Sequence, residues 1–500
     1  MILAAYDFGT TGCKGSFFDV NGSLVATAYH EYPTYFPQEG WVEQEPEDWI
    51  KAISTVTKDL LAKSEINPAD IACLSFSGHM MGCVPVNKNG DPLTDRAFLW
   101  ADSRSQLQTE NLEKIIGRER FYTETGGGLE TILYPAVKIP WIKQNQPDIY
   151  NKAVSFLGTK DTVCAWLTGR LATDYSEASD IGLLDINKRC WHEEFLRILD
   201  IDPQKMPELV SSTTVIGKLQ RKPAQEIGLL EGTPVVIGGG DVACGTAGAG
   251  VVSEGLPYMC IGSAGWVSVA CKEPIIHPVG RPMSICHVVD DLYCSQIIMY
   301  SAGVTYKWMR DEVFSFQLPE KENKPESGAF KLMDQLAKSS PPGANGVLFL
   351  PYLRPGGAPF YNPASKGAFL NLSLPTTKAD LLRATLEGVA YNISLMITYL
   401  EEDQHFPDIR IIGGGSESRL WMQIFADVLQ KNIISLTAQQ DANTLGAALV
   451  GGIGIGIIKE FSEIDRFNKV EEIIRPNEEN FSVYQDRTKE YKAIFESLYE

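Results

Sequence analysis

Two short glycine turns are the segments of this sequence best suited to hold phosphate. Near the start, an apolar strand leads into Asp7 and then Gly9-Thr10-Thr11-Gly12, with Lys14 two residues later. In the second half, another apolar strand leads into Gly262-Ser263-Ala264-Gly265. Tight glycine turns direct several backbone N–H groups at one point, which suits an anion. Two matched turns, one in each half, predict a duplicated fold that holds a polyphosphate between two lobes.

The charged residues beside the first turn suggest how the phosphate is neutralised. A carboxylate at Asp7 would repel phosphate unless a divalent cation lay between them, so we expect Asp7 to hold Mg²⁺. The alternative is an acid that caps the loop through an Asx-turn. Lys14 could reach a terminal phosphate as a point charge. The alternative for Lys14 is a solvated surface lysine.

A third segment places one carboxylate after three glycines. The apolar run 235–237 leads through Gly238-Gly239-Gly240 to Asp241, and a stretch of small residues typical of a helix start follows. Aspartate at a helix N-terminus is often only a cap, but the glycines leave room for a substrate to come close. Transfer of phosphate to an alcohol needs a base for the hydroxyl proton. We therefore predict that Asp241 is that base.

A strand, a glycine turn and a helix start recur near residue 414. The apolar run 409–412 leads into Gly413, Gly414 and Gly415, and Ser418 follows. Such a turn lets a phosphate or a flat ring approach the backbone, although any α/β crossover can use it. Gly414, Gly415 and Ser418 are therefore candidate nucleotide-binding residues, together with Thr10, Thr11, Lys14 and the turn Gly262, Ser263, Ala264 and Gly265.

The candidate substrate residues follow another apolar strand, 71–76. His79, Met80 and Met81 come directly after it, at the strand end where open α/β sheets place ligands, and Trp100 and Asp102 come soon after. A Trp ring stacks on a sugar, and Asp and His bond its hydroxyl groups. The alternatives are core packing for the two methionines and satisfied structural roles for the histidine and aspartate.

The order of elements predicts an α/β fold of two lobes. Apolar runs predict strands at 3–7, 15–20, 24–29, 71–76 and 153–157, with a helix that starts at Pro46. The second half repeats this order, with strands at 258–261, 266–270, 292–297, 347–350 and 409–412 and helices at 378–400 and 417–429. We expect an N-terminal lobe at 1–245, a C-terminal lobe at 246–460 and a helical segment at 461–500 that packs on a lobe.

Composition excludes several classes of protein. A chain of 500 residues is long enough for two or three domains, and its net charge of −19 argues against nucleic-acid binding. The 10 cysteines lack metal-site spacing, which favours reduced thiols of a cytoplasmic protein. The longest uncharged stretch, 442–458, is shorter than the roughly 20 residues of a membrane span. We expect a cytoplasmic protein with neither nucleic-acid nor membrane partners.

Taken together and in this order, the motifs resemble the FGGY carbohydrate kinases of the actin/hexokinase-like superfamily. The resemblance covers nearly the whole chain, and four further segments are similar to family signatures: 40–48, 168–179, 367–372 and 380–388. Asn371 stands where the family usually has glycine. The resemblance implies two ribonuclease-H-like lobes, ATP and Mg²⁺ in the cleft between them, and phosphorylation of a sugar or polyol hydroxyl. It also implies a homodimer.

The same resemblance assigns roles by position. Asp241 matches the catalytic base; Asp7, Thr10, Thr11 and Lys14 match the first phosphate motif. The turn from Gly262 to Gly265 matches the second phosphate motif, and Gly414 and Gly415 match the adenosine motif.

Within the family, the chain resembles the xylulokinases, which implies D-xylulose as acceptor. Their sugar loop is Ser-Gly-Gln-Met-His-Gly, whereas this chain has His79, Met80 and Met81 at the three central positions. Val242 stands where they usually have Asn after the catalytic Asp. Loss of polar contacts can switch a substrate, so gluconate, L-xylulose, ribulose and a dihydroxypentanedione signal stay open. A non-catalytic actin-like ATPase or a sugar-sensing regulator is the alternative from another class.

Overall fold

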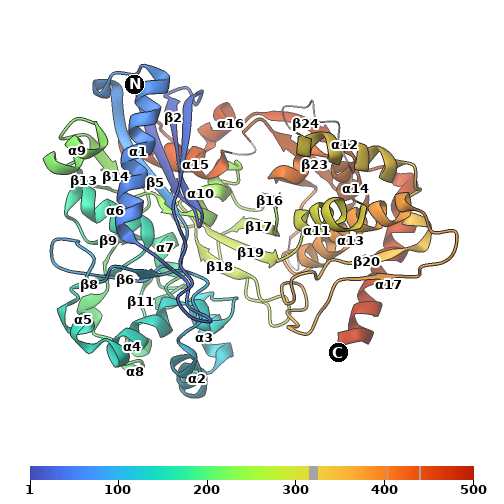
Figure 1. Ribbon diagram of the computed structural model, residues 1–500, viewed down its shortest axis with the longest axis horizontal. Coiled ribbons are helices and arrows are strands. Elements are labelled where there is room, and N and C mark those ends of the chain that lie inside the picture. The colour runs from blue at the N-terminus through green and yellow to red at the C-terminus, as the bar shows by residue number, and fades with distance from the viewer. Residues whose placement is uncertain (315–324, 402–403, 439–440, 500) are drawn as a thin grey trace.

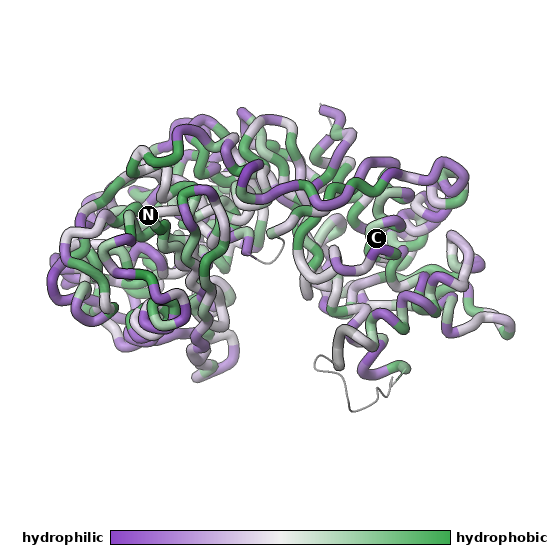
Figure 2. Tube along the Cα trace, turned by 90° about the horizontal axis from the view of Figure 1, so that it is seen from above, coloured by the Kyte–Doolittle hydropathy of each residue, from purple (hydrophilic) through white to green (hydrophobic). Residues whose placement is uncertain are grey.

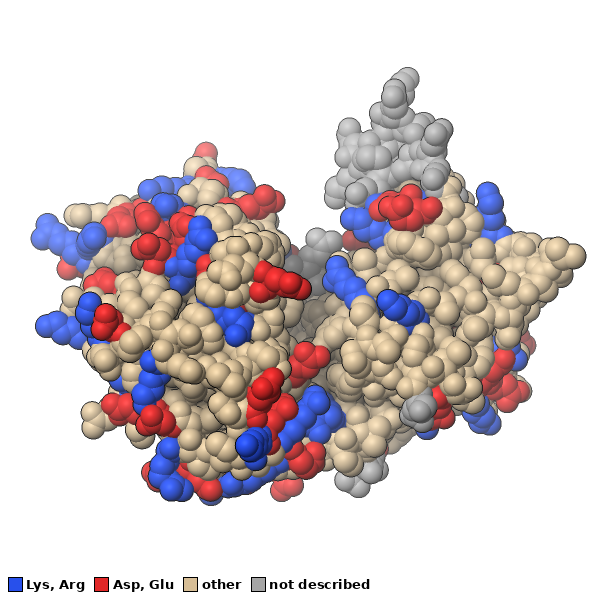
Figure 3. Space-filling view, turned by 60° about the horizontal axis from the view of Figure 1, so that its bottom comes forward, with Lys and Arg blue, Asp and Glu red and all other residues tan. Residues whose placement is uncertain are grey.

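The protein consists of two lobes, each built around a seven-stranded sheet (Figure 1). The computed structural model describes residues 1–314, 325–401, 404–438 and 441–499. Seen from above, the two lobes lie side by side (Figure 2), and the space-filling view shows the surface hollowed between them (Figure 3). The predicted α/β fold of two lobes is confirmed. No helix in the described ranges is long and apolar enough to cross a membrane.

The first sheet combines an antiparallel meander with parallel strands. β1 (Ile2–Phe8), β2 (Gly12–Asp19) and β3 (Leu24–Glu31) are antiparallel neighbours, and β5 (Ile71–Gly78) lies parallel to β1 on the other side. β14 (Pro234–Val236) is parallel to β5, and β13 (Val215–Lys218) closes the edge antiparallel to β14. β15 (Gly239–Gly240) pairs with the end of β5. The carboxyl ends of β1, β5 and β15 therefore meet at one edge.

Six strands of the second sheet repeat the order and directions of six strands in the first. Its order is β18–β19–β17–β16–β22–β23–β24. β19, β17 and β16 are antiparallel, β22 and β23 run parallel to β16, and β24 runs antiparallel to β23. This is the pattern of β3, β2, β1, β5, β14 and β13, with β18 added at the outer edge. The strands are β16 (Pro257–Ile261), β17 (Gly265–Cys271), β18 (Met283–Cys286), β19 (Tyr293–Met299), β22 (Asp408–Ile412), β23 (Asn432–Leu436) and β24 (Val470–Ile474).

Helices cover both faces of the first sheet. α1 (Pro46–Ser64) has proline in its first turn and buries Trp49, Ile53, Val56 and Leu60 at helical spacing against β2 and β3. α15 (Ala442–Gly454) packs on β1 and β5. Because α15 follows β23 in the chain, the second half of the sequence supplies a helix to the first sheet, although its residues fall in the range 246–460. The domain boundaries themselves stay predictions.

The second sheet is covered by a separate group of helices. α13 (Lys378–Thr398) begins with a capping box formed by Thr377 and Asp380, and α14 (Arg419–Leu429) begins after its N-cap, Ser418. α12 (Pro325–Lys338) and α17 (Phe481–Tyr499) pack against this pair.

One predicted strand of the second half pairs outside the large sheet, and one expectation needs correction in detail. β20 (Leu348–Leu350) does not join the large sheet but pairs with β21 (Ala368–Leu370) in a two-stranded sheet of its own. The range 461–500, expected to be helical, also contains β24 of the large sheet. Apolar runs identify a strand but not its partner.

The remaining elements lie mostly in the first lobe. Its short strands are β4 (Glu43–Gln44), β6 (Val84–Val86), β7 (Ala97–Phe98), β8 (Ser155–Leu157), β9 (Ala172–Asp174), β10 (Leu184–Asp185), β11 (Cys190–Trp191) and β12 (Glu208–Val210). Its other helices are α2 (Gln106–Ile115), α3 (Arg118–Thr125), α4 (Pro135–Asn145), α5 (Pro147–Lys152), α6 (Thr159–Thr168), α7 (Tyr175–Ser179), α8 (Glu193–Ile198) and α9 (Arg221–Ile227). The second half of the chain adds α11 (Gly303–Trp308) in the second lobe and α16 (Ile464–Phe467), whose Ile464 and Phe467 join the core of the first lobe.

Two helices touch each other closely where the lobes meet. α10 (Asp241–Gly248) packs on α15. A Cβ on Gly446 would lie 1.9 Å from the carbonyl oxygen of Cys244, and a Cβ on Gly248 would lie 1.8 Å from that of Ala442. Glycine at these two positions therefore permits the contact, which fixes the start of α10 relative to the first sheet.

We predict that Gly446→Ala destabilises the fold. The added methyl group meets backbone rather than a flexible side chain, so the two helices must separate, at a cost of roughly 1–3 kcal/mol. Urea denaturation followed by circular dichroism measures the change. Gly414→Ala is the matched control, because a Cβ there meets no described atom within 4 Å. Equal denaturation midpoints for the two variants would contradict the prediction.

Candidate active site

The two glycine turns have the predicted form, each closing an antiparallel pair of strands. In the first turn the backbone N–H of Gly9 donates to the carbonyl of Gly12 at 3.0 Å, and in the second the N–H of Gly262 donates to the carbonyl of Ala264 at 3.0 Å. Asp7 and Lys14 are cross-strand neighbours in the first pair. The first glycine turn, predicted to bind phosphate, is thus flanked by an acidic and a basic side chain on opposite strands.

Asp7 lies at the end of β1, where side chains from two other elements hold its carboxylate. The hydroxyl of Ser77, at the end of β5, donates to one oxygen at 2.6 Å, and the amide of Asn443, from α15, donates to the other at 3.2 Å. Burial raises the pKa of Asp7, and these two hydrogen bonds oppose the rise. The carboxylate is therefore fixed in orientation by both halves of the chain.

Asp241 is the first residue of α10, directly after β15. Because β15 pairs with Ser77 and Gly78 of β5, the carboxyl group of Asp241 is brought to the same sheet edge as Asp7. The backbone N–H of Val242 donates to its Oδ1 at 2.8 Å. Burial, and then the charge of Asp7, raise the pKa of Asp241 to about 7. A carboxyl group with this pKa can accept a proton near neutral pH.

Close contacts with neighbouring residues leave no room for a side chain at two of the glycines before Asp241. Gly238 has a φ of +73°, and a Cβ there would lie 1.8 Å from the carbonyl oxygen of Phe76. A Cβ on Gly240 would lie 2.4 Å from the sulfur of Met80. The loop after β5 therefore packs directly on the backbone beside Asp241, and Met80 lies next to the candidate base.

The other two residues of this loop have structural contacts. His79 is buried, and its Nε2 lies 3.1 Å from the hydroxyl of Thr159. Burial lowers the pKa of His79 to about 4, so its ring is neutral at physiological pH. Met81 has a φ of +61°, and its carbonyl accepts a hydrogen bond from Lys138 at 3.1 Å. Met80 and Met81 are both buried.

Trp100, a predicted substrate residue, hydrogen-bonds to the first glycine turn. Its indole N–H donates to the hydroxyl of Thr10 at 3.2 Å, while its side chain stays 42% exposed. The hydroxyl of Thr11 instead bonds that of Tyr29 at 2.9 Å. An exposed aromatic ring beside a phosphate turn is well placed to cover a bound sugar.

Asp102 has a structural role in this geometry. It is fully buried, and Arg104 bonds both of its oxygens, at 2.9 Å and 2.6 Å. The backbone N–H of Val42 also donates to Asp102, at 2.8 Å. We therefore do not propose Asp102 as a substrate ligand.

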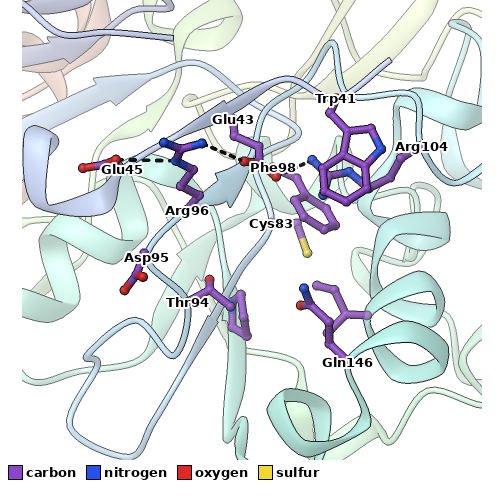
Figure 4. Close-up of a pocket in the computed structure, with 12 residues that line it drawn as sticks. Trp41, Glu43, Glu45, Cys83, Thr94, Asp95, Arg96, Phe98, Arg104 and Gln146 are labelled. Atoms are coloured by element: carbon purple, nitrogen blue, oxygen red, sulfur yellow. Dashed lines mark hydrogen bonds and ion pairs between the residues drawn. The ribbon is translucent and has the colours of Figure 1, made fainter. Parts of the chain in front are cut away.

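The same arginine borders a separate cavity of about 380 Å³ (Figure 4). Arg104 lies 3.5 Å above the ring of Trp41 and pairs with Glu43 at 2.6 Å. Arg96 pairs with Glu43 and Glu45 across the cavity wall (Figure 4). The charged groups drawn there are thus engaged mostly with one another.

The second lobe contains a cavity of about 340 Å³ that brings the other predicted residues together. Gly262, Ser263, Gly414, Gly415 and Ser418 all line it. A Cβ on Gly415 would lie 2.4 Å from Ile261, so glycine lets this turn lie against the end of β16. Two turns far apart in the sequence therefore form one concave, largely apolar site. Ala264 and Gly265 complete the β16–β17 hairpin beside it.

Sequence reasoning missed three residues of this cavity. Tyr306 and Phe330 stack with ring centroids 5.9 Å apart, and Trp421 lies 6.0 Å from Tyr306. Asp334 accepts hydrogen bonds from Tyr306 at 3.0 Å and from Ser418 at 2.7 Å. Tyr306, Phe330 and Asp334 come from α11 and α12, and only their amphipathic helical spacing could have indicated that they face inward.

Lys14 bridges the two halves of the chain. Its ammonium group lies 2.5 Å from the carboxylate of Asp441, which precedes α15. Both side chains are partly exposed. Lys14, which was predicted to reach a phosphate, therefore pairs with the Asp441 carboxylate, and a phosphate oxygen could take the place of that carboxylate.

Comparisons with known proteins agree with this geometry. Residues 1–248 match the model of the N-terminal domain of the FGGY family of carbohydrate kinases, and residues 272–455 match that of its C-terminal domain. The chain is 30% identical to a xylulose kinase of Staphylococcus epidermidis over 500 residues, 100% of this chain and 96% of that one. It is 28% identical to a gluconokinase of Bacillus subtilis, over 98% of this chain and 94% of that one.

Solved structures give the same result. A xylulose kinase from Brucella ovis superposes with a TM-score of 0.90 at 26% identity, covering 100% of this chain and 99% of that one. A ligand-bound xylulose kinase from Lactobacillus acidophilus has the same fold, with a TM-score of 0.90 at 24% identity, covering 99% of this chain and 98% of that one. The chain belongs to the FGGY family of carbohydrate kinases and is a sugar kinase.

Proposed function

We propose that this sugar kinase transfers the γ-phosphate of ATP to a terminal hydroxyl group of D-xylulose. The observation that carries the proposal is the position of Asp241, at the sheet edge shared with Asp7 and the first phosphate turn. Relatives named xylulose kinases, at 28–30% identity over nearly the whole chain, support xylulose as the acceptor. The match to a gluconokinase makes gluconate the second candidate.

In this proposal Asp241 acts as the general base. Its ionised carboxylate takes the proton of the acceptor hydroxyl as that oxygen attacks the γ-phosphorus, and the bond from phosphorus to the β,γ-bridging oxygen breaks. Asp241 leaves the step protonated, and ADP carries away the electron pair of the broken bond. Met80 and Trp100 hold the acceptor beside the base, and closure of the lobes excludes water that would otherwise accept the phosphate.

The nucleotide is proposed to span the two lobes. Its base and ribose fit the cavity lined by Tyr306, Phe330 and Trp421, with Gly414, Gly415 and Ser418 at its backbone side. The turns at Thr10–Thr11 and Gly262–Gly265 supply N–H groups for the phosphates. Lys14 exchanges Asp441 for a phosphate oxygen when the nucleotide binds.

The residues at the sheet edge fit Mg²⁺. Asp7 offers a carboxylate oriented by Ser77 and Asn443, and oxygen is the donor that Mg²⁺ prefers. In the described part of the chain there is no cluster of three or more acidic, His or Cys side chains able to form a complete cage. Mg²⁺ normally needs only one or two carboxylates, with water and phosphate completing its shell. When bound, the ion would neutralise charge between Asp7 and the phosphates.

The location and assembly of the protein are also proposals. All ten cysteines lie in the described ranges as free thiols, and nine of them are buried. This arrangement favours a reducing compartment such as the cytoplasm. The homodimer implied by the family resemblance stays a prediction.

The proposed function is tested by ADP release with Mg-ATP and a panel of acceptors: D-xylulose, L-xylulose, D-ribulose, D-gluconate, glycerol and erythritol. We expect the highest kcat/KM with D-xylulose. Asp241→Asn should lower kcat by roughly 10²–10⁴-fold, because the general base is lost. ATP affinity, measured by calorimetry, should change less than about twofold, since Asp241 lies outside the nucleotide cavity. A near-normal rate for Asp241→Asn would contradict the base assignment.

The pH dependence of catalysis follows from the pKa of Asp241. The group must be ionised to accept a proton, and its pKa is raised to about 7. Activity is therefore lost as pH falls below that value, and kcat/KM for the acceptor should drop about tenfold per unit below it. Initial rates from pH 5.5 to 8.5 at saturating Mg-ATP measure this limb. A flat profile across that range would overturn the prediction.

Removal of the metal provides a further test. Excess EDTA should abolish turnover, and added Mg²⁺ should restore it. Asp7→Asn should lower kcat at least about tenfold and raise the Mg²⁺ concentration needed for half-maximal rate, because one anionic ligand is lost. Asp19→Asn is the matched control, since Asp19 lies at the opposite end of the same hairpin and caps its own turn. An equal effect of both substitutions would argue against a metal ligand at Asp7.

A further inference from the structure

One carboxyl group on the wall of the cavity in the second lobe has no role in the proposed transfer of phosphate. Asp334, from α12, lines this cavity of about 340 Å³ and is partly buried. Three other charged side chains among the described residues of the wall are all exposed: Lys307, Lys331 and Glu417. A carboxylate repels phosphate, so Asp334 needs a different partner on the nucleotide.

Two hydroxyl groups hold Asp334 as a hydrogen-bond acceptor. The hydroxyl of Ser418 accepts from the backbone N–H of Trp421 at 3.1 Å and donates its own proton to one oxygen of Asp334 at 2.7 Å. The hydroxyl of Tyr306 donates to the other oxygen at 3.0 Å. Burial raises the pKa of Asp334, and these two hydrogen bonds oppose the rise. The side chain is therefore fixed in place as a carboxylate, which accepts hydrogen bonds and donates none.

The position of Asp334 along the cavity corresponds to the base of a bound nucleotide. The second glycine turn, proposed to hold phosphate, lies at the start of α11, because the N–H of Gly303 donates to the carbonyl of Gly262 at 2.8 Å. Tyr306 lies nearly one helical turn further along α11, and Asp334 bonds the hydroxyl at the outer end of its ring. A nucleotide with its phosphates at the turn has its ribose next and its base furthest away. Asp334 therefore lies at the base end.

Aromatic side chains near Asp334 supply the apolar surface that a purine needs. The rings of Tyr306 and Phe330 stack with an interplanar angle of 19°, and the ring of Trp421 lies 6.0 Å from that of Tyr306. The faces of adenine, guanine and hypoxanthine are alike, so these contacts do not distinguish one purine from another. Selection among purines needs a polar group that reads the edge of the base, and Asp334 is placed to do so.

We propose that Asp334 selects ATP over GTP and ITP by accepting a hydrogen bond from the 6-amino group of adenine. Adenine has an N–H donor at this position, whereas guanine and hypoxanthine have a carbonyl oxygen, which can only accept. A carboxylate beside that carbonyl would place two acceptors together without a donor. A site built to bond a polar group rejects the analogue that lacks it far more strongly than an apolar pocket does. The inference rests on the proposed function, because it assumes that the nucleotide binds in this cavity with its phosphates at the second glycine turn.

The test compares ATP, ITP, GTP and 2′-deoxy-ATP as phosphate donors for the full-length wild type and Asp334→Asn, with the best acceptor at saturation. In the wild type, kcat/KM for ATP should exceed that for ITP at least about 100-fold. The amide of Asp334→Asn can donate to the carbonyl of hypoxanthine, so the ratio of kcat/KM for ITP to that for ATP should rise at least about tenfold. 2′-Deoxy-ATP should match ATP within about threefold in both proteins, because the contact is to the base.

A binding measurement and a control variant separate base recognition from a structural role. Calorimetry with ADP and IDP needs no acceptor and should show the same change of ratio. Asp334→Asn should also keep its melting temperature within about 3 °C, because the hydroxyls of Ser418 and Tyr306 can each donate to or accept from an amide. Asp408→Asn is the matched control, since Asp408 begins β22 outside the described wall of the cavity and bonds Asn432 at 2.8 Å. It should alter none of the ratios.

The outcomes separate this inference from the proposed function. If the wild type phosphorylates D-xylulose with ATP but Asp334→Asn leaves the ITP to ATP ratio unchanged, the inference is wrong and the function stands. An equal loss of affinity for ADP and IDP with a lower melting temperature shows a structural role and also overturns it. A change in the 2′-deoxy-ATP ratio instead of the ITP ratio shows a contact to the ribose and contradicts the base assignment. Absence of acceptor-dependent turnover would reject the proposed function, while the affinities for ADP and IDP still decide the inference.

Discussion

The repulsion between Asp7 and Asp241 is the constraint on which the rest of the site depends. Asp7 lies at the end of β1, and Asp241 directly follows β15 of the same sheet. The fold therefore holds two carboxyl groups close to each other. Burial, and then the charge of Asp7, raise the pKa of Asp241 to about 7, which is close to the value a base needs at neutral pH. The divalent cation and the phosphate proposed to bind at this edge would relieve the same repulsion. Hydrogen bonds from Ser77 and Asn443 fix the orientation of the Asp7 carboxylate.

Duplication of the sheet explains how one chain builds both sides of the site. Each sheet begins with an antiparallel meander whose first turn carries glycines, and each continues with two parallel strands. The two copies have diverged beyond the ends of the parallel strands. In the first lobe those strand ends carry Asp241 and the loop with Met80, whereas in the second they carry a glycine turn facing aromatic rings. One architecture thus presents the proposed base on one side and the proposed nucleotide cavity on the other.

The spacing of residues along the sequence predicted those parts of the fold and site that depend on nearby residues. The strands, the glycine turns and the start of α1 at Pro46 follow from apolar periodicity and turn residues, which act over a few positions. Asp102 shows where such reasoning stops. Its residue type fits both a sugar ligand and a structural acid, and only the structure shows that it bonds Arg104 and Val42. Tyr306 and Phe330 were missed because their importance comes from contacts with distant segments. The pairing of β20 with β21, and the packing of α15 on the first sheet, are likewise decided by tertiary structure.

The placement of α15 also bears on the order in which the protein can fold during synthesis. One face of the first sheet, around Leu3 and Cys73, is covered by glycines 451 and 452 of this helix. A ribosome that has made only the first half of the chain has therefore produced a sheet with an uncovered apolar face. That face stays open until Gly454 has left the exit tunnel, so the nascent first lobe must wait for the second, shielded by chaperones or by transient collapse, before its core closes.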